Sequence, residues 1–374
     1  MARPLGLLLA GTALLIATAC ADREDAGVTA LADAASGFVE RLEAPGLAVA
    51  VLRDGELVWS EGFGRTGTGA DSPAVTDRTV FEFASLSKTV FAAVAVGLAE
   101  QGVYDLDGNL GPAADFPRIA DASAFAAVTP RLVLSHGTAL PNWADEDGGP
   151  LAFSGAPGSR FNYSGEAYGL LQAMLERRTG SGLDELFAPL AAEAGMTESH
   201  YAAGAAGAAA EPVLAVNRDG STRQRRDAAQ PHAAASLTTS VHDYARFLVW
   251  LFDAQQAGLR AALFTPTQET AWDYYGAEGE MPEGVELDWG LGWGLYREDG
   301  RRIAFHWGDN GAFKSFVAID LDRRDAIVFA ANGFDGMCVT VPLTAPVVGD
   351  LGTVTDWLNY SRIDSGSPVC PDRE

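Results

Sequence analysis

One charged residue interrupts a long apolar segment in the first third of the chain. From Leu86 to Ala99 most residues are Ala, Val, Leu or Phe, and Lys88 is the only charged one. A helix that is apolar on every face has to be buried, so the chain must fold around it with a large core. A lysine ammonium is costly to bury without a partner. Lys88 therefore either extends its amine to the surface or is held inside for a chemical reason.

The composition is that of an acidic globular protein. The chain has 374 residues, enough for a large core in one or two domains, and 48% are hydrophobic. Asp and Glu number 50 and Lys and Arg 26, which gives a net charge of −24. This balance argues against nucleic acid as a partner and against an anionic membrane bound through a broad basic face. The acidic run 269–288 is interpreted as solvated surface.

The N-terminus has the pattern of an export signal. Arg3 precedes an apolar stretch, Leu5 to Ile16, which is too short to span a membrane as a helix. The small residues before Cys20 resemble a bacterial lipoprotein cleavage site, which predicts a signal peptide over residues 1–19 and a lipid on Cys20. The protein is then expected on the periplasmic side of the cell envelope, touching the membrane only through that anchor. Cleavage at an Ala-x-Ala site, giving a soluble secreted protein, is the alternative.

The chain has three cysteines, and an odd number in an exported protein needs an explanation. If Cys20 carries a lipid, Cys338 and Cys370 remain as a candidate disulfide in an oxidising compartment. That bridge would tie the C-terminal tail to the body of the protein. Two free thiols are the alternative.

Strand patterns lie at both ends of the chain, and helical patterns lie between them. Residues 46–64 alternate and turn at Asp54-Gly55, which predicts a hairpin. Further strands are predicted near the other end, at 301–307, 312–321 and 325–333. Helices are predicted at 23–43, 84–101, 165–179, 182–194, 240–257 and, interrupted by Pro342 and Pro346, at 341–361. Residues 202–210 are interpreted as a linker or loose loop.

These patterns predict an α+β fold in which one antiparallel sheet is assembled from both chain ends and flanked by helices. A mostly helical region is inserted in the middle. We expect residues 23–374 to form a single catalytic unit, with a sheet subdomain at 23–80 and 289–361 and a helical subdomain at 81–288. A cleft would lie where the two meet, a common place for a site.

The apolar segment offers a chemical reason for burying a lysine. Ser85 lies at the start of the predicted helix, and residues at i and i+3 share a helix face, so the Lys88 amine can reach the Ser85 hydroxyl. A serine hydroxyl is a poor nucleophile until a base takes its proton, and apolar surroundings favour the neutral, basic form of a lysine. A lysine that extends to the surface beside a helix-capping serine is the alternative.

Two further stretches carry groups that suit the same chemistry. Tyr163 lies on a loop just before a predicted helix, and a phenol becomes a base when an ammonium lies beside it. His306, Trp307 and Gly308 lie on a predicted strand, where the glycine would let a substrate approach the backbone closely. The next N–H group, that of Asp309, could join the N–H of Ser85 as an oxyanion hole.

The three stretches together resemble the serine β-lactamase and penicillin-binding-protein family. Ser85-Leu86-Ser87-Lys88, Tyr163-Ser164-Gly165 and His306-Trp307-Gly308 follow the order of its motifs S-x-x-K, Y-x-N and K-T-G or H-x-G. The resemblance runs over residues 40–335. The resemblance implies a β-lactamase/transpeptidase-like fold and an acyl-enzyme mechanism. Ser85 would be the nucleophile, and Lys88 and Tyr163 would share the role of general base. Which of these two residues holds the proton stays open. Small-molecule esters, amides or peptides would be the substrates, with no cofactor or metal.

Two departures from the family pattern bear on the substrate. The amide of Y-x-N, which helps hold the lysine and the substrate's amide, is replaced by Gly165; Glu166 is either its substitute or a surface glutamate. His306 replaces the lysine of K-T-G and is a weaker anchor for a carboxylate. Lys314 would supply that positive charge unless it is a solvent-facing strand lysine. Both departures imply weak or no β-lactamase activity. With them the chain resembles the class C β-lactamase-related esterases and D-aminopeptidases more than the penicillin-hydrolysing members of the family.

Other classes of protein fit the sequence less well. The histidines show no spacing typical of a metal site, and no G-x-S-x-G motif of the α/β-hydrolases is present. A non-catalytic receptor or scaffold of the cell envelope with this fold is the alternative. The presence of Ser85, Lys88 and Tyr163 together argues against it, whereas the altered Asn and Lys positions favour it.

Overall fold

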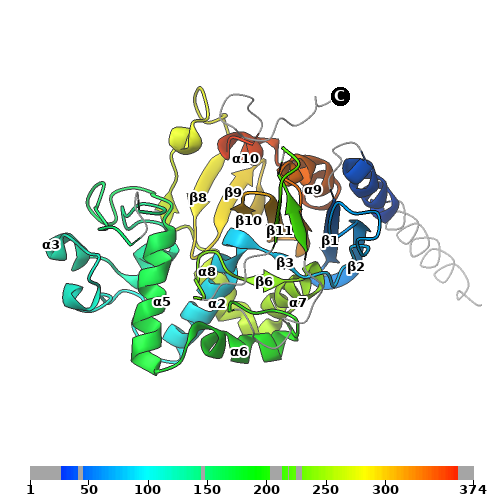
Figure 1. Cartoon of the computed structure of the whole chain (residues 1–374). Coiled ribbons are helices and arrows are strands. Elements are labelled where there is room, and N and C mark those ends of the chain that lie inside the picture. The colour runs from blue at the N-terminus through cyan, green and yellow to red at the C-terminus, as the bar shows by residue number, and fades with distance from the viewer. Residues whose placement is uncertain are drawn as a thin grey trace, which may run out of the picture.

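The computed structural model describes residues 27–40, 45–144, 148–202, 213–217, 219–224 and 230–360. Within them an antiparallel sheet of eight strands has the order β2-β1-β12-β11-β10-β9-β8-β7 (Figure 1). The strands, in that order, are β2 (Glu56–Gly64), β1 (Gly46–Arg53), β12 (Asp325–Ala331), β11 (Phe313–Asp320), β10 (Arg301–Asn310), β9 (Gly294–Glu298), β8 (Glu286–Trp289) and β7 (Gln268–Glu269).

Both chain ends contribute to this sheet, as the sequence predicts. β1 and β2 form the expected hairpin, and the turn residues Asp54 and Gly55 have positive φ angles of 48° and 82°. This is the backbone that a tight hairpin between right-twisted strands requires. β1 also pairs with β12, Val49 opposite Phe329, so an N-terminal strand lies beside the last strand in the described part of the chain. The predicted α+β class and the sheet from both chain ends are confirmed.

The sheet is covered on both faces, which is why β1 is apolar at almost every position rather than alternating. Leu47, Val49 and Val51 point into a core shared with the helix at 27–40, α9 (Thr340–Val348) and α10 (Gly352–Trp357). Ala48, Ala50 and Leu52 point into the other core, which holds the helices of the inserted region. Figure 1 shows α9 and α10 at one side of the sheet and α6 and α7 at the other.

The helices of the inserted region agree closely with the predicted ranges. Helix α5 occupies the predicted 165–179; Ser164 caps its first turn and Gly180, at φ 77°, ends it. The segment predicted at 84–101 begins with a 3-10 turn, η1 (Ala84–Leu86), before α2. The longer helices of the region are α2 (Ser87–Glu100), α5 (Gly165–Thr179), α6 (Leu183–Ala194), α7 (Val241–Phe252) and α8 (Ala257–Leu263). Short ones are α3 (Ala122–Phe125) and α4 (Pro130–Leu134).

Three predicted boundaries differ from the structure. The helix expected at 341–361 is two helices, α9 and α10, because Gly349 takes a φ of 100° between them. The helix expected at 240–257 ends at Phe252 in α7. Strand β7 and all of β8 except Trp289 lie inside the region 81–288, which the sequence predicts to be mostly helical, yet both strands pair into the sheet. They were missed because the run 269–288 is so acidic that it resembles solvated surface.

The division into two subdomains within one unit remains a prediction. Most of the expected loop 202–210, and the C-terminal tail beyond residue 360, lie outside the described residues. Among the helices that the structure describes, none has both the length and the apolar character of a transmembrane span.

Candidate active site

Ser85 and Lys88 meet where η1 passes into α2. The Lys88 ammonium nitrogen, Nζ, lies 3.0 Å from Ser85 Oγ and donates a second hydrogen bond to the Ala234 carbonyl oxygen at 2.9 Å. The Lys88 side chain is fully buried, and this desolvation holds the pKa of its amine well below the usual range of a lysine. Lys88 is therefore held inside, with its amine directed at the Ser85 hydroxyl. The alternative of a surface-reaching lysine is wrong.

The turn that presents Ser85 is fixed on several sides. Ala84 has a positive φ of 48°, a conformation that costs energy for a residue with a Cβ. The Ser87 hydroxyl donates to the Ala84 carbonyl and accepts from the Leu237 N–H at 2.8 Å, and Ser315 Oγ donates to the Phe83 carbonyl at 2.8 Å. These buried bonds hold the strained residue in place, which fixes the position of the next side chain.

Gly308 on β10 contacts this turn directly. A Cβ at this position would lie 2.3 Å from the Phe83 carbonyl oxygen and 3.2 Å from the Ala84 Cβ. We expected the glycine to admit a substrate to the backbone; instead the closest approach is that of the chain's own segment before Ser85. The contact brings the Asp309 position of β10 alongside the turn that carries Ser85.

Tyr163 lies over the lysine with its ring rather than pairing through its hydroxyl. Lys88 Nζ is 4.6 Å from the centroid of the Tyr163 ring. The ring also stacks on Trp307, with centroids 5.2 Å apart, and lies 4.2 Å from the His136 ring. Burial raises the pKa of the phenol, which the nearby Ser85 hydroxyl offsets only in part. Tyr163 Oη makes no hydrogen bond within the described residues, so it is a neutral phenol in the resting site.

His306 is neutral and fully buried on β10. Its Nδ1 lies 2.8 Å from the Trp307 carbonyl oxygen, and since a carbonyl only accepts, Nδ1 carries the proton. Nε2 is then a bare acceptor, and it has no hydrogen-bond partner in the part of the chain that the structure describes. Burial lowers the pKa of His306 to about 3, with a further contribution from the charge of Lys88. The predicted substrate-binding residues His306 and Trp307 therefore present a lone pair and an aromatic ring, not a cation.

Trp143 occupies the space next to Gly165, the position at which the family pattern has an amide side chain. A Cβ on Gly165 would lie 2.7 Å from Cη2 of the Trp143 indole. Glu166 is not the surface glutamate considered above, because it is 8% exposed, and both of its oxygens accept from the Arg118 guanidinium at 2.7 and 2.8 Å. Nor does Glu166 replace the amide, since the Ala144 N–H also bonds to its carboxylate. Trp143 ends the stretch RLVLSHGTALPNW (131–143), which resembles a family stretch, but the sequence does not predict its contact with Gly165.

Lys314 is not the solvent-facing lysine considered above. It is 2% exposed, and its Nζ pairs with Asp309 Oδ2 at 2.7 Å. The Tyr360 hydroxyl donates to the same carboxylate oxygen at 2.9 Å. The charge of Lys314 is therefore compensated by Asp309 and is not free to attract a substrate carboxylate.

Two neighbours of Tyr163 were not assigned to the site from the sequence. His136, with φ at 57°, accepts the Ser164 N–H on Nδ1 at 3.0 Å, and its ring contacts the Tyr163 ring at a tilt of 36°. Tyr274 accepts the Tyr163 N–H on its hydroxyl at 2.8 Å. Both hold the loop that presents Tyr163. His136 lies in the stretch 131–143, where the sequence predicts a structural role for it, whereas no motif marks the segment of Tyr274.

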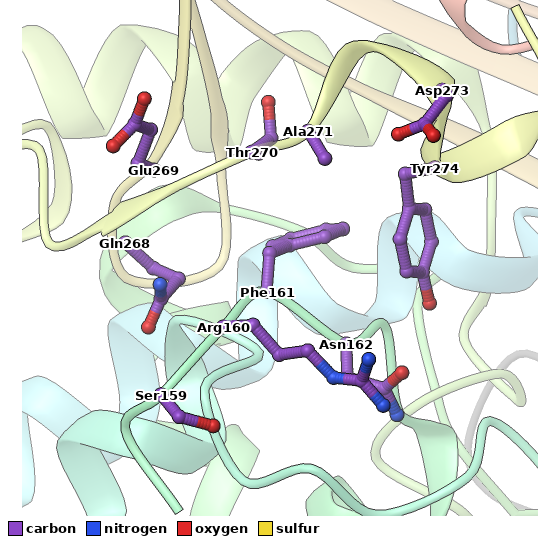
Figure 2. A pocket seen from close by; sticks show the side chains of 10 residues that line it. All are labelled: Ser159, Arg160, Phe161, Asn162, Gln268, Glu269, Thr270, Ala271, Asp273 and Tyr274. Atoms are coloured by element: carbon purple, nitrogen blue, oxygen red, sulfur yellow. The ribbon is translucent and has the colours of Figure 1, made fainter. Parts of the chain in front are cut away.

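A surface pocket of about 450 Å³ lies next to this loop. Figure 2 shows segment 159–162 along one side, segment 268–274 along the other, and the Phe161 ring between them. Its lining does not include Ser85, Lys88 or Tyr163 among the described residues. The pocket is thus a neighbour of the candidate catalytic residues and is not lined by them.

The lipidation site Cys20 and the cysteine Cys370 lie outside the described residues. Cys338 is disulfide-bonded, and the other two cysteines of the chain both lie outside the described ranges. Its pairing with Cys370 remains a prediction.

Comparison with known proteins gives a family and two kinds of relative. The model of the family described as Beta-lactamase matches residues 31–341. The human protein named serine beta-lactamase-like protein LACTB, mitochondrial, is 35% identical over 98 residues. These residues are 26% of this chain and only 18% of that relative's length.

Solved structures share the fold at low identity. A class C beta-lactamase superimposes with a TM-score of 0.68 at 17% identity, covering 90% of this chain and 96% of the other. The D-alanine carboxypeptidase AmpC from Burkholderia cenocepacia gives 0.66 at 19% identity, covering 83% and 95%. At such identities the likeness concerns the fold alone. Because the family model spans most of the chain and the fold agrees with it, the protein belongs to the Beta-lactamase family of serine hydrolases.

Proposed function

We propose that the protein hydrolyses esters or D-amino-acid amides through an acyl-enzyme on Ser85. The observation that carries the proposal is the 3.0 Å contact between Ser85 Oγ and the buried amine of Lys88. Burial depresses the pKa of Lys88, which favours the neutral form of the amine that can act as a base. A scaffold would have no use for a buried amine that has no carboxylate partner among the described residues and lies beside a serine that follows a strained residue, Ala84.

In the acylation step the Ser85 hydroxyl proton passes to Lys88 Nζ while Oγ forms a bond to the substrate's carbonyl carbon. The carbonyl oxygen becomes an oxyanion, which the N–H groups of Ser85 and Asp309 stabilise. The leaving alcohol or amine departs with a proton from Lys88, passed directly or through Tyr163. Since burial raises the pKa of Tyr163, we assign the resting base to Lys88 and the relay to Tyr163.

In the deacylation step a water molecule takes the place of the leaving group. Its proton goes to the neutral amine of Lys88, and its oxygen attacks the acyl carbon. The bond to Ser85 Oγ then breaks and the proton returns to Ser85, which releases the acid and restores the site. No cofactor or metal is needed for either step.

The neutral His306 supports esters or uncharged amides over penicillins, since a penicillin brings a carboxylate that needs a cation. The D-alanine carboxypeptidase among the structural neighbours makes D-amino-acid substrates worth testing. We therefore propose weak or no β-lactamase activity.

We also propose that the protein is exported to the periplasmic side of the cell envelope and lipid-anchored at Cys20. The apolar stretch and the small residues before Cys20 support this. In cells given a labelled fatty acid, Cys20→Ser should abolish labelling of the protein. Undiminished labelling would contradict the anchor, and a soluble secreted protein would remain.

The catalytic proposal is tested by hydrolysis of p-nitrophenyl butyrate by the protein without its signal, beside Ser85→Ala. We expect turnover that disappears in the variant, together with labelling of Ser85 by a fluorophosphonate. Nitrocefin and D-alanyl peptides then rank the substrate classes. Turnover that persists in Ser85→Ala would overturn the nucleophile. Neither turnover nor labelling in the wild type would favour the non-catalytic receptor.

A further inference from the structure

Trp143 is a large aromatic residue left half exposed beside the catalytic loop. Its side chain is 47% exposed, whereas most other tryptophans in the described residues are buried in the two cores. The segment that carries it is firmly attached to the start of α5. Asn142 accepts the Gly165 N–H both on its carbonyl oxygen and on Oδ1, each at 3.0 Å. The Ala144 N–H donates to Glu166 Oε1 at 3.0 Å. Trp143 is therefore held between two anchored neighbours.

The Trp143 ring lies against the backbone of the residue two positions after Tyr163. A Cβ on Gly165 would meet Cη2, Cζ2 and Cζ3 of the indole at 2.7, 2.8 and 3.0 Å. Any side chain at position 165 would thus have to displace the ring. Glycine at 165 and tryptophan at 143 are one structural unit, in which the ring occupies the volume that a side chain at 165 would take.

A second ring links Trp143 to the catalytic lysine. His232 meets the indole edge to face, with centroids 5.3 Å apart, and its own ring lies over Gly169, one helical turn beyond Gly165. His232 Nδ1 accepts the Ala234 N–H at 3.1 Å, and the Ala234 carbonyl accepts from Lys88. The rings of Trp143 and His232 together form a wall. Through the hydrogen bond between His232 and Ala234, this wall connects to the carbonyl that binds the Lys88 amine.

The hydrogen-bond acceptors next to this wall already have donors. The Glu166 carboxylate is shared between Arg118 and the Ala144 N–H, Asn142 Oδ1 accepts from Gly165, and His232 Nδ1 accepts from Ala234. The N–H of a substrate amide placed against the indole would therefore lose its hydrogen bond to water without replacing it, which is costly. A hydrocarbon chain in the same place would gain by covering apolar surface.

We propose that Trp143 is a specificity-determining residue that favours unsubstituted alkanoyl groups on Ser85 and disfavours acyl groups with an amide next to the reacting carbon. This inference rests on the proposed acyl-enzyme at Ser85 and narrows its substrates to simple esters. N-acylated peptides and penicillins carry such an amide and would be poor substrates for this reason, independently of the charge at His306.

Two boronic acids test the proposal without needing turnover. Butylboronic acid and acetamidomethylboronic acid have chains of equal length, and only the second carries an amide. Each forms a B–O bond with Ser85 Oγ, whose proton leaves to Lys88, so the ratio of their dissociation constants reports on the amide alone. We expect the butyl compound to bind the wild type more tightly, and Trp143→Ala to shift the ratio by about tenfold toward the amide compound.

Three variants serve as controls. Trp143→Phe keeps an aromatic wall and should keep the preference for the butyl compound, whereas Trp143→Gln offers an amide partner and should reverse it. Trp250→Ala removes a partly buried tryptophan on α7 and should leave the ratio unchanged. Gly165→Ala should shift the ratio as Trp143→Ala does, but should have little further effect when combined with it.

An unchanged ratio in both Trp143→Ala and Trp143→Gln, with boronate still bound, would overturn the role of Trp143 and leave the proposed function intact. If instead neither compound binds the wild type and fluorophosphonate does not label Ser85, the proposed function itself fails and this inference with it. Adducts that persist in Ser85→Ala would show that boron reacts elsewhere.

Discussion

Lys88 combines two properties that rarely occur together in a lysine: it is fully buried, and the described residues give it a hydroxyl and a carbonyl but no carboxylate within hydrogen-bonding distance. Burial depresses the pKa of the Lys88 amine. A nearby carboxylate would raise this pKa again, but the described residues place none within hydrogen-bonding distance. We predict that Lys88→Arg lowers kcat/KM for p-nitrophenyl butyrate by roughly 10²- to 10⁴-fold, because a guanidinium stays protonated and cannot act as a base. The measurement is steady-state hydrolysis, with the melting temperature as a check of folding.

The same lysine determines the direction of the pH profile. Since the neutral amine is the active form, wild-type kcat/KM should rise with pH and level off above the depressed pKa. A rise delayed until pH 10.5, the ordinary value for a lysine, would contradict the burial argument. If kcat/KM of Lys88→Arg equals that of the wild type, another residue is the base.

His306 leads to a prediction about charged substrates. With a pKa near 3, it carries no charge at any pH from 5 to 8, and Lys314 is neutralised by Asp309. The KM of a monosuccinyl ester relative to that of the matching butyryl ester should therefore stay constant over this range. If the ratio falls as the pH drops through 6 to 7 in the wild type but not in His306→Gln, His306 is charging in the site and its assignment as neutral is wrong.

At the scale of elements, the site depends on how closely β10 approaches the turn before α2. Gly308→Ala would place a methyl group 2.2 Å from Ser315 Oγ and 2.3 Å from the Phe83 carbonyl, so the turn must move. We predict a loss of about 1–3 kcal/mol in the free energy of unfolding and at least a hundredfold fall in kcat, since about 1 Å of misplacement has that effect. Gly97→Ala on α2 is the matched control, because nothing lies within 4 Å of its Cβ, and it should stabilise slightly. Equal effects of the two substitutions would show that contact with β10 does not position Ser85.

The elements that the sequence predicts well are those with a strong local signal. The hairpin at Asp54-Gly55 and α5, with Ser164 and Gly180 at its ends, have turn or capping residues that act over a few positions. β7 and β8 were missed because two- and four-residue strands carry no period of their own and are fixed by pairing partners. The contacts of Trp143, Ala234 and Tyr274 were not predicted for a related reason: each joins segments far apart in the sequence, through a ring, a carbonyl or a hydroxyl, and a motif does not record such contacts.

At the scale of the whole molecule, buried histidines collect where the sheet meets the inserted region. His306 comes from β10, His136 follows α4, and His232 precedes the strand that pairs with Phe81-Glu82. Burial lowers the pKa of all three, to about 3 for His306 and about 4 for His232. Each is thus a neutral group in the fold that becomes a cation when the chain unfolds in mild acid.

The sign of this linkage predicts how the protein responds to pH. Above about pH 6.5 these histidines are neutral in both the folded and the unfolded protein, so they contribute no pH dependence to stability. Below about pH 6.5 the histidines of the unfolded chain bind protons, whereas those of the folded protein stay neutral. The free energy of unfolding therefore falls as the pH decreases toward the pKa values of the folded protein. For His306 alone the loss between pH 6.5 and 5 is about 2 kcal/mol. Urea unfolding at the two pH values should show His306→Gln losing less stability than the wild type by about that amount. If His306→Gln and the wild type lose stability in parallel, His306 is protonated in the folded protein, and both the neutral tautomer and the uncharged substrate site derived from it are wrong.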